Sequence, residues 1–250
     1  MRLQITGAVK HILIINVVMF IGTLTIGNGE LFYRWFALYF PKNDFFQPWQ
    51  IITHMFMHGG PSHILFNMFG LWMFGTAVEQ RLGTNKFLFV YFSAGIGAVL
   101  FQLGYYYFQY LPLETELVST GVTLAEIKQM LSTNSLLPGV NLEQKLKLQH
   151  MFNVYNASMV GASGCIMGIL AAFGMMNPNA KLMMLFLPIP IKAKYFIPGI
   201  ILLDIFSAFS GQSFFSPSNT AYMAHVGGAL TGFIIMWYWK KNSMNKYRMD

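Results

Sequence analysis

Six stretches of the chain are apolar enough and long enough to cross a membrane as helices. A spanning helix needs about 20 mostly apolar residues. The windows that meet this requirement are roughly 9–27, 63–80, 86–108, 160–178, 195–212 and 222–240. A further apolar stretch, 182–191, is short and contains prolines that would break a helix, so we expect an interfacial loop there. The pattern predicts an all-α membrane protein with six transmembrane helices.

Composition agrees with a membrane protein rather than a soluble one. The chain has 250 residues, of which 55% are hydrophobic and 10% are charged, and its mean hydropathy is +0.48. Soluble domains carry about 25% charged residues. No repeat or separate soluble segment interrupts the pattern, so we expect a single membrane domain over 1–250. The lone Cys165 excludes an intrachain disulfide, and the first apolar run lacks the cleavage site of a signal peptide.

The basic residues predict the orientation of the spans. If both termini lie on one side, that side holds eleven of them: Arg2, Lys10, Arg81, Lys86, Lys181, Lys192, Lys194, Lys240, Lys241, Lys246 and Arg248. The opposite side holds the other five: Arg34, Lys42, Lys128, Lys145 and Lys147. The positive-inside rule then predicts cytoplasmic termini and outward loops at 28–62, 109–159 and 213–221. The net charge of +7 is therefore a topology signal, and we expect lipid rather than nucleic acid as a partner.

Four polar residues fall at a similar depth near the outward ends of predicted spans. His63 and Asn67 share one face of the second span, because they are four residues apart. Ser163 begins the fourth span between two glycines, and His225 lies in the sixth. Any one of these residues could simply form a hydrogen bond between two helices. Their convergence at one depth favours a functional site, because burying an ionisable group in a membrane is costly.

These residue types suit nucleophilic catalysis. A serine hydroxyl becomes a nucleophile when a base removes its proton, and the neutral imidazole of His225 can serve as that base. The Asn67 amide, the His63 ring and the backbone N–H of Ser163 could stabilise the oxyanion that follows. No acid is in an obvious position to orient His225, so a Ser-His dyad is expected. Asp204, in the middle of the fifth span, could be a buried hydrogen-bonding anchor or could face a water-filled interior.

The sequence resembles the rhomboid family of intramembrane serine proteases. The motifs that carry the resemblance are GASG around Ser163, HILFN with His63 and Asn67, AHVGGALTG with His225, THMFMHGGPSH over 53–63, and EQR over 79–81. Together they cover roughly 45–110 and 155–240. The resemblance implies hydrolysis of peptide bonds of transmembrane proteins by a dyad of Ser163 and His225, without metal or cofactor, in a bacterial cytoplasmic membrane. It also implies a movable gate formed by the fifth span and the loop 211–221.

Two positions depart from the family pattern. Gln50 follows Trp49 where the family often has arginine. Met167 stands four residues after Ser163, where the family commonly has an aromatic residue against the catalytic histidine. A thioether can also pack against a ring. Two other readings stay open: an inactive rhomboid-like protein that binds transmembrane clients, and a transporter whose polar residues line a path.

The segment 111–155 has no counterpart in the minimal six-span pattern and is too polar to span a membrane. Thr123 with Glu126 is typical of a capping box, which predicts a helix to about Leu131. Asn141 could cap a second helix with one broad apolar side, which we expect to lie in the headgroup layer. The insert could be a spacer over the outer edge of the third and fourth spans, or it could help to dock substrates.

His54 and His58 are four residues apart and suggest a metal, but no carboxylate lies near them in the sequence. We therefore expect them to hold water near the dyad, with no metal at the site. Glu79 and Arg81 are expected to brace the inner end of the second span and the loop after it.

Overall fold

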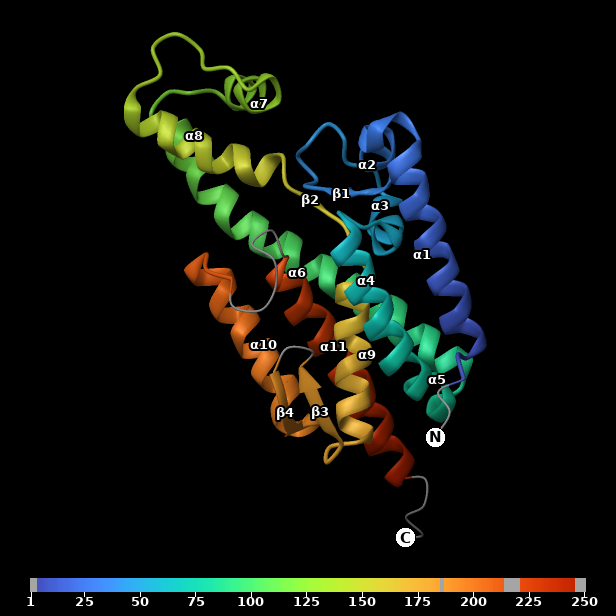
Figure 1. Cartoon of the computed structure of the whole chain (residues 1–250). Coiled ribbons are helices and arrows are strands. Elements are labelled where there is room, and N and C mark those ends of the chain that lie inside the picture. Colours follow the sequence, from blue (N-terminus) through green and yellow to red (C-terminus); the bar gives the residue numbers. More distant parts are fainter. Residues whose placement is uncertain (1–3, 185–186, 214–220, 246–250) are drawn as a thin grey trace.

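The computed structural model describes residues 4–184, 187–213 and 221–245, and the chain is mostly helical (Figure 1). The helices are α1 (Gly7–Thr25), α2 (Glu30–Phe36), α3 (Gln50–Thr53), α4 (Pro61–Gly70), α5 (Thr76–Leu82), α6 (Thr84–Ser119), α7 (Leu124–Thr133), α8 (Leu142–Tyr155), α9 (Ser163–Met176), α10 (Ala193–Ser210) and α11 (Tyr222–Asn245). A π-helical turn, Leu71–Gly75, joins α4 to α5. Each predicted span thus coincides with helical structure. Within the described residues, three helices, α1, α6 and α10, are long and apolar enough to cross a membrane, and the shorter α9 is also apolar.

Two small antiparallel sheets accompany the helices. Strand β1 (Leu38–Tyr39) pairs with β2 (Ser158–Met159), and β3 (Lys181–Met184) pairs with β4 (Leu187–Lys192). Where an interfacial loop was expected, at 182–191, the structure has most of the β3–β4 hairpin. Proline is tolerated in edge strands, where an N–H group on the outer side pairs with no neighbouring strand. Both strands of a two-stranded hairpin are edge strands. The hairpin connects α9 to α10 (Figure 1).

Helix α9 lies at the centre of the bundle, between α4, α6 and α11 (Figure 1). Small residues let these helices approach closely. A Cβ added to Gly168 would lie 2.2 Å from the Cβ of Ala94 in α6, and one added to Gly232 of α11 would lie 2.3 Å from the carbonyl oxygen of Gly168. The glycines therefore bring the backbones of α9 and α11 into direct contact, as small residues do in membrane bundles.

Glu79 ties α5 to the first turn of α1. Its carboxylate accepts hydrogen bonds from the backbone N–H groups of Ala8 at 3.1 Å and Val9 at 3.0 Å, and from the hydroxyl of Thr84 at 2.8 Å. The amides of a first helical turn have no partner within the helix, so a carboxylate there stabilises the helix end. Arg81 donates to the carbonyl of Met176 at the end of α9. These contacts confirm that Glu79 and Arg81 brace this end of the bundle.

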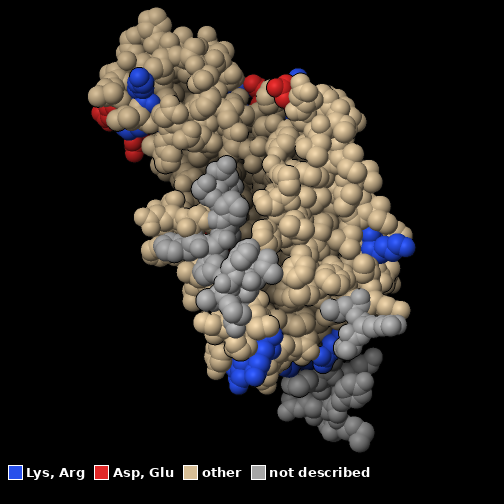
Figure 2. All heavy atoms as spheres, in the orientation of Figure 1, with Lys and Arg blue, Asp and Glu red and all other residues tan. Residues whose placement is uncertain are grey.

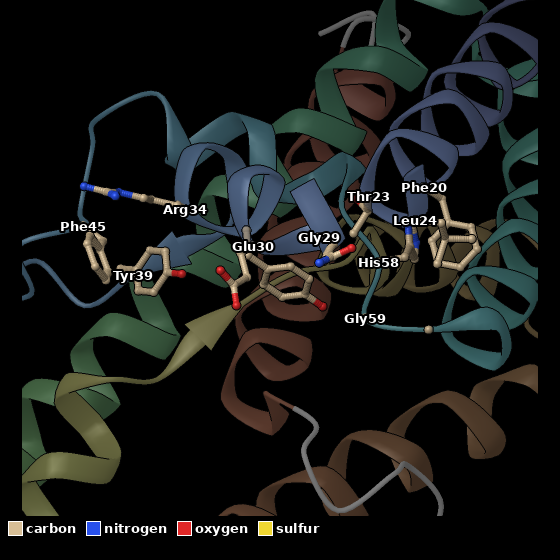
Figure 3. Close-up of a pocket in the computed structure, with 13 residues that line it drawn as sticks. Phe20, Thr23, Leu24, Gly29, Glu30, Arg34, Tyr39, Phe45, His58 and Gly59 are labelled. Carbon is tan, nitrogen blue, oxygen red and sulfur yellow. The ribbon is translucent and has the colours of Figure 1, made fainter. Parts of the chain in front are cut away.

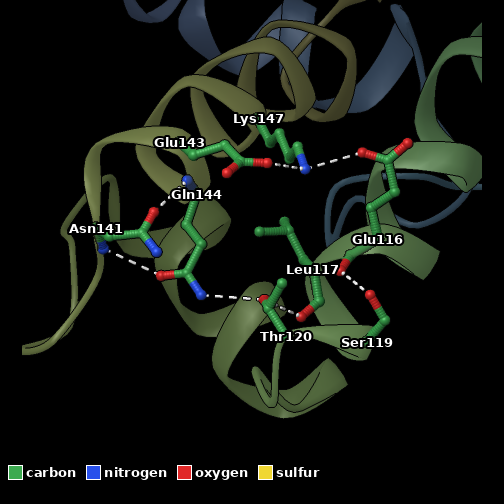
Figure 4. A network of polar contacts seen from close by, with 8 residues as sticks. All are labelled: Glu116, Leu117, Ser119, Thr120, Asn141, Glu143, Gln144 and Lys147. Carbon is green, nitrogen blue, oxygen red and sulfur yellow. Dashed lines mark hydrogen bonds and ion pairs between the residues drawn. The ribbon is translucent and has the colours of Figure 1, made fainter.

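The insert forms two capped helices on the far end of α6. The expected capping box of Thr123 with Glu126 is present, and Asn141 caps α8 as expected, in a capping box with Gln144. Figure 4 shows how α8 is joined to α6: the Gln144 amide donates to the Thr120 hydroxyl at 3.0 Å, while Lys147 pairs with Glu116 on α6 and Glu143 on α8. The predicted third span, 86–108, is therefore only the first part of α6, which continues to Ser119 beneath the insert.

Each of α7 and α8 packs some of its apolar side chains against the rest of the protein. An apolar cluster joins Phe40, Tyr110 and Leu117 with Ile127 of α7 and Met151 of α8. The side predicted as one apolar face of α8 is divided, because Leu142 and Leu146 are exposed. The insert thus has an apolar core of its own, shared with the end of α6 and the loop that contains Phe40.

The two ends of the bundle differ in charge. The described ends of the chain lie together, opposite α7 and α8 (Figure 1). On the face that Figure 2 shows, Lys and Arg lie at the end near the termini, whereas the opposite end carries Asp and Glu together with Lys and Arg. Large apolar side chains such as Leu100, Leu202 and Phe209 are exposed on the faces between the two ends. Apolar surface of this extent, bounded by charged ends, is typical of a protein embedded in lipid.

Candidate active site

Ser163 is the first residue of α9, and the loop before it is held in place by backbone contacts. The N–H of Gly161 donates to the carbonyl of His54 at 2.9 Å. Gly161 has φ +126°, which favours glycine, so the chain can turn sharply before the helix. Strand β2, just upstream, is fixed by its pairing with β1. Ser163 therefore lies at a helix N-terminus, where free amides and the positive end of the helix dipole favour an anion.

His225 of α11 faces Ser163 across the contact between the two helices. Its Nε2 atom lies 2.9 Å from the Oγ atom of Ser163. The start of α11 is anchored by the N–H of Ala224, which donates to the side chain of Gln102 in α6 at 3.2 Å. The structure thus brings together the two residues that the sequence suggests as nucleophile and base.

Asp204 also reaches the site, although the sequence places no acid in an obvious position beside His225. Its Oδ2 atom lies 3.0 Å from Nδ1 of His225, and the residue is 4% exposed. Of the two alternatives for Asp204, the structure bears out the buried hydrogen-bonding anchor. An acidic residue inside a predicted span indicates a functional site, because its burial in a membrane is costly. Spacing along the chain could not show that α10 is rotated to turn this side chain toward α11.

His63 and Asn67 lie on the other side of the Gly161 turn. A Cβ on Gly161 would be 2.7 Å from Nε2 of His63 and 3.6 Å from the Nδ2 atom of Asn67. The Nδ2 atom of Asn67 is buried and has no hydrogen-bond partner among the described residues. A buried donor without a partner is costly, so such a group is available for a ligand that supplies an acceptor. The four predicted site residues therefore converge, with Asp204 added.

This arrangement fits an activated serine. With Asp204 accepting from Nδ1–H, the Nε2 atom of His225 is left unprotonated and can accept the proton of Ser163. The start of α9, the Asn67 amide and the His63 ring surround the same turn, where negative charge on an oxygen would be stabilised.

Two further histidines flank the site on the side of the first loop. The ring of His58 meets that of His63 edge to face, with 5.1 Å between centroids. Burial, together with the nearby His63, lowers the pKa of His58 to about 3, and burial lowers the pKa of His54 to about 4. Both rings are therefore neutral at neutral pH. The Nδ1 atom of His54 lies 2.8 Å from the carbonyl oxygen of Gln50, four residues earlier.

A separate pocket has His58 in its lining. It is lined by the end of α1, by α2 and by the loop residues 58–60, with Tyr33, Arg34 and Tyr39 among its walls (Figure 3). Neither Ser163 nor His225 lines it. The candidate nucleophile and base therefore lie outside this hollow.

Comparison with known proteins decides the family. The sequence model of the rhomboid domain matches residues 46–125 and 141–242, which include all of the site residues above. The chain belongs to the rhomboid family. It is also 27% identical over 192 residues to Rhomboid protein 1, mitochondrial, of Saccharomyces cerevisiae, a match that covers 76% of this chain and 42% of that protein. The chain thus spans less than half the length of that relative.

Membership of the rhomboid family supports an intramembrane protease or a rhomboid-like function, in an integral membrane protein with mostly helical structure. The rhomboid match leaves out 126–140, which contains most of α7 and the loop before α8.

Gln50 anchors the first loop of this rhomboid in the position where the family often has arginine. The residue is fully buried, and its amide nitrogen donates to the carbonyls of Arg34 at 3.1 Å and Phe45 at 2.9 Å. Its Oε1 atom accepts from the N–H of Gln47 at 3.0 Å. One side chain thus joins separate turns of the loop, so the loop is anchored despite the missing arginine.

Met167, the other departure, is buried in an apolar cluster with Leu170 of α9, Ala193 and Ile197 of α10, and Ala229 of α11. Its side chain therefore belongs to the packing between these three helices, one turn below Ser163.

Proposed function

We propose that this rhomboid is an intramembrane serine endopeptidase in which Ser163 is the nucleophile and His225 the general base. The observation that carries the proposal is the 2.9 Å contact between Ser163 Oγ and His225 Nε2 at the N-terminus of α9. A nucleophile within hydrogen-bond reach of its base is the requirement for activating a serine hydroxyl.

The reaction follows from the positions of these groups. The Oγ atom attacks the carbonyl carbon of the scissile peptide bond while its proton passes to Nε2 of His225. The Asn67 amide, the His63 ring and the backbone N–H of Ser163 stabilise the resulting oxyanion. His225 then gives the proton to the departing amine, leaving an acyl group on Ser163. A water molecule, deprotonated by His225, hydrolyses this ester and restores the serine.

The substrates that fit this site are segments of other transmembrane proteins. Ser163 begins α9 near the end of the bundle opposite the termini, so a peptide bond would be cut near that surface of the bilayer. We propose six spans, formed by α1, α4 with α5, α6, α9, α10 and α11. The concentration of basic residues near the termini supports cytoplasmic termini by the positive-inside rule. We also propose the cytoplasmic membrane of a bacterium as its location.

We propose that the substrate enters the site where α10 moves aside. Its buried face consists of Ala193, Ile197, Asp204 and Ser207, and its other residues are exposed or only partly buried. A helix held along one narrow face can move aside more readily than α9, which is surrounded. The following loop contains Phe214 and Phe215, expected to plug the opening, and these lie outside the described residues.

The alternative within the family is an inactive protein that binds transmembrane clients. A purified sample treated with a fluorophosphonate probe distinguishes the two. An active enzyme forms a covalent adduct that peptide mass spectrometry locates at Ser163, and His225→Ala prevents it because the hydroxyl is no longer activated. A wild-type protein that is folded and remains unlabelled would contradict the protease assignment.

A further inference from the structure

Asp204 is a buried carboxylate in the middle of a membrane helix, and such a group needs a partner. It is 4% exposed, and its Oδ2 atom lies 3.0 Å from Nδ1 of His225. The other ring nitrogen of His225 faces Ser163 at 2.9 Å. The three side chains therefore form one continuous line from α10 through α11 to α9.

We propose that Asp204 is a positioning residue that completes a relay of Ser163, His225 and Asp204. This inference rests on the proposed function, because it assigns to Asp204 the orientation of the base that the proposed reaction uses.

Packing of α10 alone does not require a carboxylate here. The N-terminal half of α10 is held by the apolar contacts of Ala193 and Ile197 with α9 and α11. Near its other end, the Tyr105 hydroxyl of α6 donates to the carbonyl of Ala208. A well-packed apolar residue between these two attachments would avoid the cost of burying a charge. The position of Asp204 opposite Nδ1 instead fits a role in setting the state of the histidine.

The carboxylate acts on His225 in two ways. It accepts a hydrogen bond only from Nδ1–H, so it selects the tautomer in which Nε2 is free to take the proton of Ser163. It also stabilises the imidazolium that forms as that proton moves. In serine proteases of unrelated fold, replacing such an acid by its amide lowers kcat on the order of 10⁴-fold because the histidine adopts the wrong tautomer.

The test compares Asp204→Asn, which keeps the size of the side chain, with Asp204→Ala and Asp204→Glu. Ser207→Ala is the matched control, since Ser207 is buried on the same helix about one turn further along. We expect Asp204→Asn to lower kcat for a soluble peptide by about 10²-fold to 10⁴-fold with little change in KM. Asp204→Glu should recover more activity than Asp204→Ala, and Ser207→Ala should resemble the wild type.

The choice of substrate separates positioning from gating. A residue that only holds α10 in place would affect a transmembrane substrate and spare a soluble peptide. We therefore expect equal loss on both substrates. Loss confined to the transmembrane substrate would overturn the role proposed for Asp204.

A second readout does not depend on activity. Solid-state nitrogen NMR of histidine-labelled protein in lipid, with the His225 signals assigned by comparison with His225→Gln, reports which ring nitrogen carries the proton. We expect protonation at Nδ1 in the wild type and a shift toward protonation at Nε2 in Asp204→Asn. The same tautomer and the same kcat in both proteins would overturn the inference. Failure of the proposed function would show differently, as a wild type that does not react with the fluorophosphonate probe.

Discussion

The backbone of Gly228 in α11 lies directly against that of Gly164 in α9. A Cβ added to Gly228 would come within 2.0 Å of the carbonyl oxygen of Gly164. Ser163 is next to Gly164 in the chain, and His225 is one helical turn before Gly228. The contact between the two glycines therefore sets the separation of the two helices at the depth where Ser163 meets His225.

Gly228→Ala should impair both stability and turnover. The added methyl group must push α11 away from the α9 backbone, since a carbonyl cannot rotate aside, and overpacking of this kind costs about 1–3 kcal/mol. We expect a lower unfolding midpoint in detergent and at least a 10-fold loss of turnover, because the Ser163–His225 contact lengthens. Gly104→Ala in α6 is the control, as its added Cβ meets no atom within 4 Å. Equal behaviour of the two variants would refute the role of the glycine contact.

Asn67→Ala should lower kcat by about 10-fold to 10³-fold without abolishing turnover, as expected when one of several oxyanion donors is removed. The reason is the buried Nδ2 atom, which has no partner among the described residues and lies beside the Gly161 turn. Single-turnover cleavage of a soluble peptide measures the effect, and the unfolding midpoint serves as the control for folding. Full kcat in a folded variant would remove Asn67 from the oxyanion site.

The insert should contribute to stability through its own apolar core. Ile127 is 1% exposed in the cluster that contains Phe40 and Tyr110, so Ile127→Ala should reduce the free energy of unfolding by about 2–5 kcal/mol. Leu124, on the same helix, is 59% exposed, and Leu124→Ala should have little effect. Detergent unfolding titrations compare the two. A neutral Ile127→Ala would show that the insert is not a brace for the end of α6.

The function of the insert is tested separately. Residues 121–140 can be replaced by a short Gly/Ser linker that keeps the Asn141 cap and all of α8. If kcat/KM of the variant, relative to wild type, is the same for a soluble peptide and for a transmembrane substrate, the spacer interpretation is supported. Selective loss on the transmembrane substrate supports docking of substrates by α7.

Acid should destabilise the protein through His58. Burial and the neighbouring His63 lower the pKa of His58 from 6.5 to about 3. Between these two pH values, His58 binds a proton in the unfolded state but not in the folded state. The stability that this histidine contributes is present above pH 6.5 and is lost as the pH falls toward 3. His58→Phe should make the fall in unfolding midpoint between pH 6.5 and 4 shallower, with the exposed His150→Phe as the control. An unchanged slope would contradict the assignment.

Much of the site could be predicted because its residues are tied to the ends of apolar segments. Ser163, His225, His63 and Asn67 each lie near the same end of a predicted span, and helices that cross one bilayer bring such residues to one depth. The capping box at Thr123 and the cap at Asn141 could also be predicted, since caps depend on residues only a few positions apart.

The rest depends on contacts that spacing does not determine. Whether Asp204 faces His225 depends on the rotation of α10 about its axis, which is set by packing on α9 and α11. The extension of α6 to Ser119 was missed because the segment after residue 110 is too polar to span a membrane, and polarity alone does not show where a helix ends. The hairpin of β3 and β4 was missed because its prolines argue against a helix without specifying a strand.

The roles of Ser163 and His225 are tested most directly by cleavage of a transmembrane substrate by wild type, Ser163→Ala, His225→Ala and the double variant, all reconstituted in liposomes. We predict that each single variant loses nearly as much turnover as the double variant, because nucleophile and base act as one unit. Unfolding midpoints close to that of the wild type would show that the variants are folded. Cleavage at the wild-type rate by either single variant would contradict the assignment of Ser163 and His225.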